Sequence, residues 1–224
     1  MKGFGDQNKV YKKQKKNNKT TKVSQEQKIN QAIQLHSEGN ISEAAKYYQY
    51  FINQGLNDCR VFSNYGLILQ NMGKLQDAEL YTRKAIEINP NFANAYANLG
   101  IILRDLGKLQ DAELYTHKAI KINSNFVNAH SNLGNILRDL GKLQDAEKSY
   151  RKAIELNPNF VDAHSNLGNI LREFGKLQDA EISYRKAIEI DPNFANAYAN
   201  LGIILLDLDK LQDAELYTRK AIEI

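Results

Sequence analysis

The chain has 224 residues and carries 30 Lys and Arg against 26 Asp and Glu, a formal net charge of +4. This charge is concentrated in residues 1–22, which contain eight Lys and one acid, Asp6, so the remaining residues are mildly acidic. An acidic body argues against nucleic-acid binding by the folded part, which would need a basic face. The single cysteine, Cys59, excludes an internal disulfide framework and a multi-cysteine metal site.

The first residues lack the apolar core of a secretion signal, and no stretch approaches the ~18 apolar residues of a membrane-spanning helix. Because no disulfide can form within the chain, a reducing compartment suits it. We therefore expect a cytoplasmic protein without a transmembrane segment.

Residues 1–24 are predicted to be a disordered basic tail, because they combine dense like charge with no hydrophobic periodicity. One interpretation is a tail that only improves solubility. The other is weak, salt-sensitive binding to a polyanion such as RNA or an anionic membrane face.

A period of 34 residues organises the rest of the chain. Ten of the 13 glycines fall into two series with this spacing, one from Gly66 to Gly202 and one from Gly39 to Gly175. All three prolines, Pro90, Pro158 and Pro192, share one phase of the period. The sequence therefore predicts repeats at 25–58, 59–92, 93–126, 127–160 and 161–194, and an incomplete repeat at 195–224.

Each repeat is predicted to form two helices, named helix A and helix B below. In 93–126, one apolar stripe runs from Tyr96 to Leu106 at spacings of three and four, and a second runs from Leu109 to Ile122. Gly107 between them suits a left-handed helix end. Each helix is too short to bury its stripe alone, so neighbouring repeats must stack. The fold class is therefore all-α, an α-helical solenoid.

Two positions hold small residues where helices A and B are expected to cross. Numbering each repeat from 1, with position 1 at Ala93 in the third repeat, glycine occupies position 8 and alanine position 20. A larger side chain at either position is expected to overpack the contact.

The repeats resemble the tetratricopeptide repeat (TPR) family. Leu-Gly stands at positions 7 and 8, a large apolar residue at 11, alanine at 20 and 27, and proline at 32. The resemblance covers residues 25–224 and is closest to bacterial TPR arrays and to the TPR arm of O-linked N-acetylglucosamine transferases. It implies a right-handed superhelix of helix pairs, in which helices A line a concave groove that binds protein partners.

The two terminal repeats depart from the family pattern. Repeat 25–58 is degenerate, with Lys28 at position 4 and Gln31-Ala32 in place of Leu-Gly, as expected of a polar end cap. The last repeat ends at Ile224 within helix B, and Asp209 replaces its inter-helix glycine. The exposed end is expected either to fray, to self-associate, or to continue into more repeats or another domain in a longer chain.

Asparagines are the candidate binding residues. Position 6 is asparagine in every repeat, and position 9 adds two more. An asparagine amide can both donate to and accept from an extended peptide backbone, which resembles the asparagine ladder of the O-linked N-acetylglucosamine transferases. The alternative is that position 6 only holds helices together. The predicted groove residues are Asn64, Asn98, Asn132, Asn135, Asn166, Asn169 and Asn200.

Charged residues and histidines give weaker signals. Arg104, Arg138 and Arg172 at position 12 stand beside acids at position 13, so the row is expected to be self-paired or solvated. The positions of a TPR clamp for chaperone tails lack the required lysines. His130 and His164 occupy the aromatic packing position 4, which favours packing over a metal site.

No motif for catalysis is present: the sequence has no phosphate-binding loop, no nucleophile elbow and no evident base beside Cys59. We expect a non-catalytic protein-interaction scaffold without cofactor or metal, whose groove binds a peptide or a helix. The alternative is the substrate-recognition arm of a larger glycosyltransferase, which would need catalytic residues outside 1–224.

Overall fold

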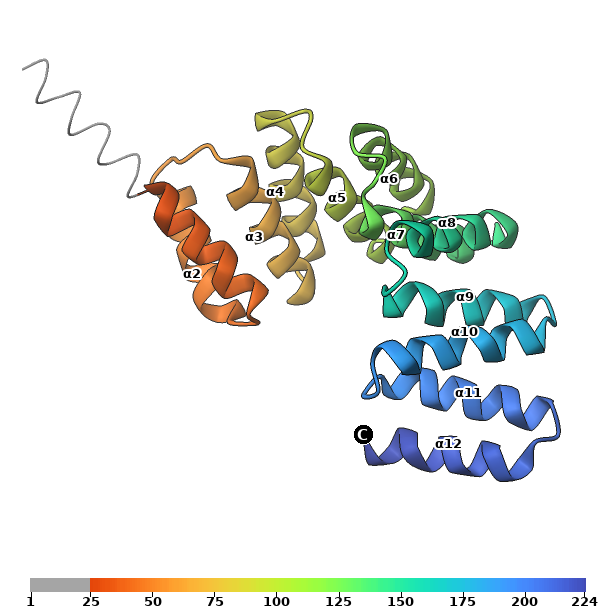
Figure 1. The fold of residues 1–224 in the computed structure, drawn as a ribbon. Helices are drawn as coiled ribbons and strands as arrows, with labels where there is room; N and C mark the ends of the chain where they lie inside the picture. Colours follow the sequence, from red (N-terminus) through yellow and green to blue (C-terminus); the bar gives the residue numbers. More distant parts are fainter. Residues whose placement is uncertain (1–24) are drawn as a thin grey trace, which may run out of the picture. The chain divides into compact units, whose positions relative to one another are not determined.

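The computed structural model describes residues 25–224, which form helices and turns and contain no strand (Figure 1). The predicted disordered basic tail, residues 1–24, lies outside the described residues. The chain divides into two compact parts, which we call the N-terminal part, up to Pro90, and the C-terminal part, Asn91–Ile224.

The N-terminal part contains a helix at residues 25–37, followed by α2 (Ile41–Asn53), α3 (Cys59–Asn71) and α4 (Leu75–Ile88). Its core is built from Ile29, Tyr48, Phe51 and Ile68, all at most 2% exposed. The degenerate first repeat therefore still buries an apolar stripe on its inner side.

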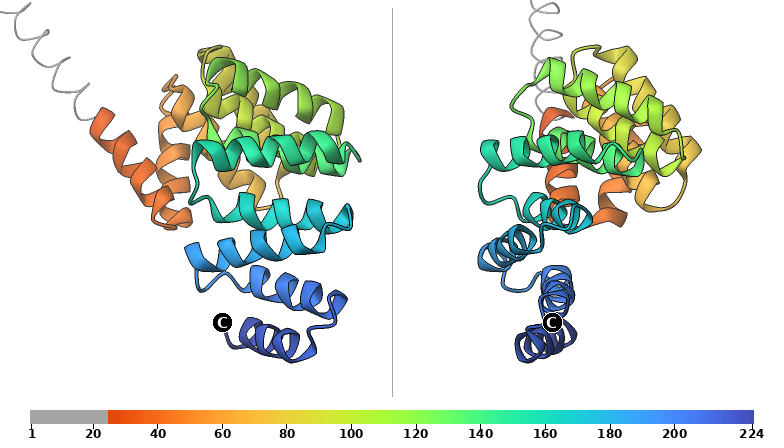
Figure 2. Two further views of the ribbon diagram at one scale, coloured as in Figure 1. Left: turned by 45° about the vertical axis from the view of Figure 1, so that its right-hand side comes forward. Right: turned by 90° about the vertical axis from the view of Figure 1, so that its right-hand side faces the viewer.

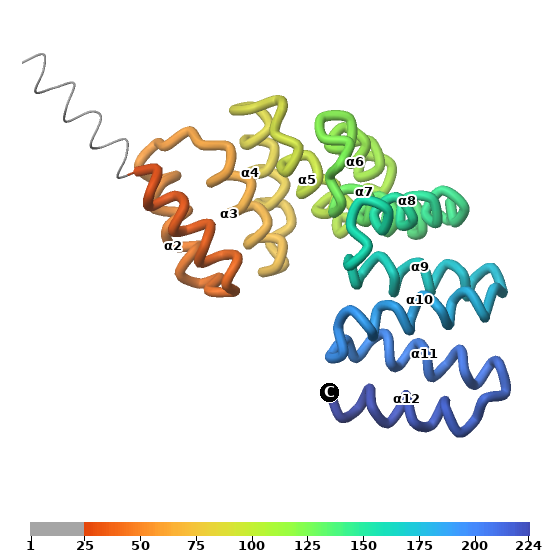
Figure 3. Tube along the Cα trace, viewed as in Figure 1, coloured from red at the N-terminus to blue at the C-terminus, as the bar shows by residue number. Residues whose placement is uncertain are grey.

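The C-terminal part is a series of helix pairs, in which the two helices of each pair run in opposite directions (Figure 3). Helix A spans positions 1–13 of each repeat and helix B positions 17–30, apart from the shorter last helix, which confirms the predicted all-α repeat array. The helices are α5 (Ala93–Asp105), α6 (Leu109–Ile122), α7 (Val127–Asp139), α8 (Leu143–Leu156), α9 (Val161–Glu173), α10 (Leu177–Ile190), α11 (Ala195–Asp207) and α12 (Leu211–Glu223).

Helices α6, α8 and α10 each pack between helix A of their own repeat and helix A of the next, and α9–α11 show this stacking clearly (Figure 2). One continuous apolar cluster extends from Leu133 on α7 to Ala214 on α12, and its members are at most 5% exposed. Burial of each Leu or Ile in this cluster contributes about 1.5–3 kcal/mol. The core is therefore shared between repeats, as the short helices require.

The turn between helices A and B has the left-handed backbone that the sequence predicts. Gly107 has a φ of +75°, and its N–H donates to the Arg104 carbonyl at 2.9 Å. The N–H of Lys108 donates to the Leu103 carbonyl at 2.8 Å, which completes a Schellman motif. Asp209 adopts a φ of +59° in the last repeat and preserves the same two bonds, so the missing glycine does not change the turn.

The turn from helix B to the next helix A is held by side chains. In repeat 127–160, the N–H of Asn159 donates to Asn157 Oδ1 at 3.1 Å, and Pro158 between them prevents continuation of α8. The half-buried His164 places its Nε2 2.8 Å from the Pro158 carbonyl oxygen. His130 makes the same contact to Ser124 at 2.9 Å, so both histidines tie helix A to the preceding turn.

The glycine at position 8 is where helix A lies closest to helix B. A Cβ added to Gly134 would lie 2.5 Å from Cε1 of Tyr150, and one added to Gly100 would collide with Thr116 Oγ1. The sequence predicts that helices A and B approach each other at the glycine of position 8, and the structure confirms this. The side chain closest to that glycine, however, belongs to the residue at position 24 of helix B. The predicted partner, alanine at position 20, contributes only its backbone oxygen, which is 3.3 Å away for Gly100.

We predict that Gly134→Ala destabilises the protein by ~1–3 kcal/mol, because the new methyl group overlaps the Tyr150 ring. Chemical denaturation monitored by circular dichroism measures this loss. Lys148→Ala, an exposed change on the same helix α8, serves as the control and should shift stability by less than ~0.5 kcal/mol. Equal stability of Gly134→Ala and the wild type would contradict the close contact.

Candidate functional site

All seven predicted groove asparagines lie on A helices and are half-buried. Asn64 lies on α3 in the N-terminal part. The other six belong to the C-terminal part, on α5, α7, α9 and α11. We call the side of these four helices that carries positions 6, 9, 12 and 13 the helix A face. Adjacent A helices of this face contact one another, α5 with α7, α7 with α9, and α9 with α11.

A hydrogen-bonded trio joins three helices within this face. The buried Tyr150 on α8 donates its hydroxyl to Asn135 Oδ1 on α7 at 2.7 Å. Asn166 on α9 donates its Nδ2 to the same oxygen at 3.3 Å. Because both partners converge on one carbonyl oxygen, the orientation of the Asn135 amide is fixed.

The same trio recurs one repeat later. Tyr184 donates to Asn169 Oδ1 at 2.8 Å, and Asn200 donates its Nδ2 to that oxygen at 3.4 Å. In both cases the asparagine at position 6 bonds to position 9 of the preceding repeat. Asn166 and Asn200 therefore each link their own helix A to helix A of the preceding repeat.

The pairing of Tyr at position 24 with Asn at position 9 was not recognised in the sequence, although its signal is present. Among the repeats from residue 59 onward, 127–160 and 161–194 have both residues. The three repeats with threonine at position 24 instead have Leu67, Ile101 and Ile203 at position 9. Thr116 is too short to reach position 9 and donates its hydroxyl to the Ala112 carbonyl at 2.8 Å.

The trios leave defined hydrogen-bonding groups on the face. The bonds found in residues 25–224 use Oδ1 of Asn135 and of Asn169, so the Nδ2 hydrogens of both amides remain for a ligand. Asn166 and Asn200 each use one Nδ2 hydrogen and retain an Oδ1 acceptor. The face can therefore offer both donors and acceptors.

Three charges on the face pair with one another, in agreement with the self-paired row that the sequence predicts. Arg104 Nε lies 3.1 Å from Asp139 Oδ2, and Arg138 Nη2 lies 3.5 Å from Asp139 Oδ1. All three side chains are about 30% exposed. Such pairs contribute little to stability, but they reduce the net charge that the face presents to a ligand.

The described residues contain no group of three or more His, Cys, Asp or Glu that could hold a metal ion. The contacts of His130 and His164 with the turns agree with the packing interpretation. Cys59 starts α3, and its Sγ accepts a hydrogen bond from Asn89 Nδ2 at 3.9 Å.

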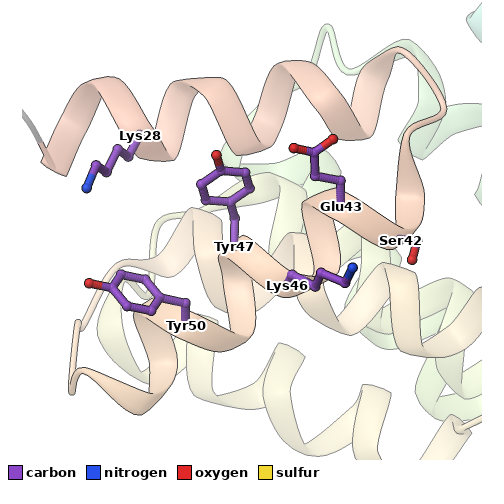
Figure 4. A pocket seen from close by; sticks show the side chains of 6 residues that line it. All are labelled: Lys28, Ser42, Glu43, Lys46, Tyr47 and Tyr50. Atoms are coloured by element: carbon purple, nitrogen blue, oxygen red, sulfur yellow. The ribbon is translucent and has the colours of Figure 1, made fainter.

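A separate open hollow of about 640 Å³ lies in the N-terminal part, between residues 25–37 and α2 (Figure 4). Lys28 approaches it from the first helix, and Ser42, Glu43, Lys46, Tyr47 and Tyr50 approach it from α2. None of the predicted groove asparagines lines this hollow. It is a surface feature of the degenerate first repeat.

The last helix exposes residues that are buried in equivalent helices. Thr116 and Ala119 on α6 are fully buried, whereas the equivalent Thr218 on α12 is exposed and Ala221 is half-buried. Ile222 is 81% exposed.

No helix within residues 25–224 combines the length and the apolar character that crossing a lipid bilayer requires.

Family models match most of the repeats. Models described as tetratricopeptide repeat match residues 59–92, 81–113 and 195–224, and a model described as TPR repeat matches residues 134–173 and 168–209. No curated protein sequence is similar enough to this chain to count as a match.

Several solved structures resemble the chain. A crystal structure of MamA is 26% identical with a TM-score of 0.62, and the alignment covers 70% of this chain and 92% of MamA. YrrB, described as a TPR protein with an unusual peptide-binding site, is 24% identical with a TM-score of 0.59, covering 80% and 92%. PilF of Pseudomonas aeruginosa has a TM-score of 0.75 at 15% identity, covering 88% and 89%.

The buried tyrosine hydroxyls predict a specific dependence of stability on pH. Burial raises the pKa of Tyr150 to about 12, whereas the unfolded chain ionises near 10. As the pH rises, the unfolded state therefore loses this proton first. The contribution of the Tyr150 hydroxyl to the free energy of unfolding is fully present below about pH 10 and is lost as the pH rises from about 10 to 12.

We predict that Tyr150→Phe reduces the fall of unfolding free energy between pH 10 and 12 by up to ~1.4 kcal/mol per pH unit. Urea denaturation at a series of pH values measures this slope. Tyr50→Phe is the control, because Tyr50 is 53% exposed and its hydroxyl meets water in both states. An unchanged slope in Tyr150→Phe would mean that this hydroxyl is solvated in the folded protein.

Proposed function

Because the chain belongs to the tetratricopeptide repeat family, we propose that it is a non-catalytic protein-interaction scaffold whose helix A face binds a peptide segment. The observation that carries the proposal is the row of half-buried asparagine amides on α7, α9 and α11. These amides offer donors and acceptors beyond those used within the protein.

Two features of the face support binding through the peptide backbone. First, amide groups pair with main-chain N–H and C=O groups regardless of the side chains that the peptide carries. Second, the Asn135 and Asn169 amides are already held by tyrosine hydroxyls, so a ligand does not have to order them. Solved proteins of this fold include YrrB, described as having a peptide-binding site, which is consistent with such a role.

A second candidate is the substrate-recognition arm of a larger glycosyltransferase similar to the O-linked N-acetylglucosamine transferases. It is favoured by the asparagine at position 6 of every repeat. Intact mass measurement of the protein from its source cells tests it. A mass well above 25.5 kDa, with a glycosyltransferase sequence in the additional residues, would support this candidate, and a mass of 25.5 kDa would eliminate it.

Two other expectations about partners stay predictions. Self-association would use the exposed end of α12, where Leu216 is 60% and Ile222 81% exposed. Polyanion binding by the basic tail concerns residues outside the described part of the chain.

We predict that changing Asn98, Asn132 and Asn166 together to alanine weakens peptide capture from a random 12-residue display library, because the change removes three of the face's amides and the bond from Asn166 to Asn135. The wild-type chain should enrich binding peptides, since its amides hydrogen-bond to the peptide backbone. Circular dichroism and a thermal melt establish whether the triple variant is folded; loss of the bond from Asn166 to Asn135 should contribute ~1 kcal/mol of destabilisation.

The matched control changes Asn125, Asn159 and Asn193 to alanine. These residues occupy position 33 in the same three repeats and are exposed in the turns between helices. This control should retain peptide capture. Equal capture by a folded Asn98, Asn132 and Asn166 variant would remove the helix A face from the proposal.

A further inference from the structure

Tyr47 in the first repeat lacks a contact that equivalent tyrosines make. In three other repeats, a tyrosine at position 23 of helix B lies against an aromatic ring at position 4 of helix A, with ring centroids 6.0–6.2 Å apart. The pairs are Phe62 with Tyr81, Tyr96 with Tyr115, and Tyr198 with Tyr217. In repeat 25–58 the residue at position 4 is Lys28, and Tyr47 makes no ring contact within residues 25–224.

The hollow of about 640 Å³ between the first helix and α2 lies where this ring is missing, because Lys28 and Tyr47 both line it. Tyr47 projects from α2 toward the first helix, and Lys28 and Tyr50 lie toward one end (Figure 4). A volume of this size is typical of sites that bind ligands. We call it the first-repeat hollow. It can hold a ring at the place that position 4 fills in other repeats.

The first-repeat hollow does not result from the absence of a preceding repeat. Its α2 wall consists of positions 18, 19, 22 and 26, which are exposed, and position 23, which is half-buried. Helix α4 follows another repeat, and its residues at these five positions have the same exposure. These residues are Gln76, Asp77, Leu80, Tyr81 and Lys84. Only position 4 differs, because Phe62 is 8% exposed whereas Lys28 lies on the surface. The residue at position 4 therefore opens the hollow.

The charges of the hollow favour an anionic group beside Lys28. The described residues three and four positions from Lys28 on its helix are all uncharged. Neither Lys28 nor Lys46 forms an ion pair within residues 25–224. Glu43 is the one acid in the lining, and it lies one turn from Lys46 on α2. The charge of Lys28 is therefore the one without a neighbouring acid.

We propose that the first-repeat hollow binds a segment of a partner protein that inserts one aromatic side chain against Tyr47 and places an acidic residue beside Lys28. The inserted ring supplies the contact that position 4 makes in three other repeats. This inference goes beyond the proposed function and does not rest on it, because no residue of the helix A face lines the hollow.

An aromatic side chain suits the hollow better than an aliphatic one. Tyr47 and Tyr50 both line it, and a pair of aromatic rings is more favourable than the buried area alone. A lysine can also lie over the face of such a ring, as Lys220 lies over Tyr198 at 5.2 Å from the ring centroid. Because the hollow is open, residues on either side of the inserted ring can continue into solvent.

The variant Lys28→Tyr tests the proposal by filling the hollow. Its new ring should lie against Tyr47 as Tyr96 lies against Tyr115. Because position 28 is exposed, the variant should fold, with a melting temperature equal to or above that of the wild type. Circular dichroism and a thermal melt check this. The matched control is Gln34→Tyr, an exposed change on the same helix outside the lining.

The experiment passes a random 12-residue display library over immobilised Lys28→Tyr and then selects the unbound peptides on the wild-type chain. The first step removes peptides that bind anywhere else, the helix A face included. The second step should enrich peptides that carry Trp, Phe or Tyr close to Asp or Glu. These peptides should bind Gln34→Tyr as they bind the wild type.

Fluorescence anisotropy with a synthetic peptide from this selection gives the magnitude. Lys28→Tyr should weaken binding roughly tenfold or more, because the hollow is closed. Lys28→Gln leaves the hollow open and removes only the charge, so it should weaken binding about two- to fivefold. Changing the acid of the peptide to its amide should have the same effect. Both changes together should weaken binding little further, because they remove one contact.

Four results would overturn the proposal: no enrichment after the depletion step, enriched peptides without an aromatic residue, equal binding by folded Lys28→Tyr, or equal binding by Lys28→Gln. The last comparison keeps the test decisive even where Lys28→Tyr fails to fold. None of these results bears on the helix A face, because peptides bound there are removed by the depletion step.

Discussion

The structure depends on the contact between the glycine at position 8 of helix A and the residue at position 24 of helix B. Because Gly134 has no Cβ, the Tyr150 ring can lie against the backbone of α7. From there the tyrosine hydroxyl reaches Asn135, and Asn135 in turn accepts from Asn166 of the next repeat. The absence of a side chain at Gly134 thus allows helices A and B of one repeat to pack closely. It also allows Tyr150 to hold the Asn135 amide, which links this repeat to the next.

A second consequence follows from the shortness of the helices. Each helix has 13 or 14 residues in the C-terminal part, and it completes its core only with its neighbours. Stability is therefore distributed over contacts between adjacent repeats. Residues on α6 that are buried between two repeats, such as Thr116, are therefore exposed on α12 of the described part, as Thr218 is.

The helix A face shows how small sequence differences between repeats change its chemistry. On α7 and α9 it is polar at position 9, because tyrosine at position 24 supports asparagine there. On α5 and α11, where position 24 is threonine, position 9 is Ile101 or Ile203. Near-identical repeats are therefore chemically distinct on this one surface.

The sequence by itself determined the 34-residue period, the helix pairs and the turns, since each depends on local signals such as the left-handed turn at Gly107 and the helix-ending Pro158. It also identified the asparagines at position 6 of helix A, because they recur in every repeat. Only the tertiary structure decided what those asparagines contact. The bond from Asn166 to Asn135 joins residues 31 positions apart on different helices, and its geometry depends on how closely neighbouring repeats pack. For the same reason the partner of Gly134 was the ring of Tyr150, 16 residues further along the chain, because the crossing of two helices in space sets that contact.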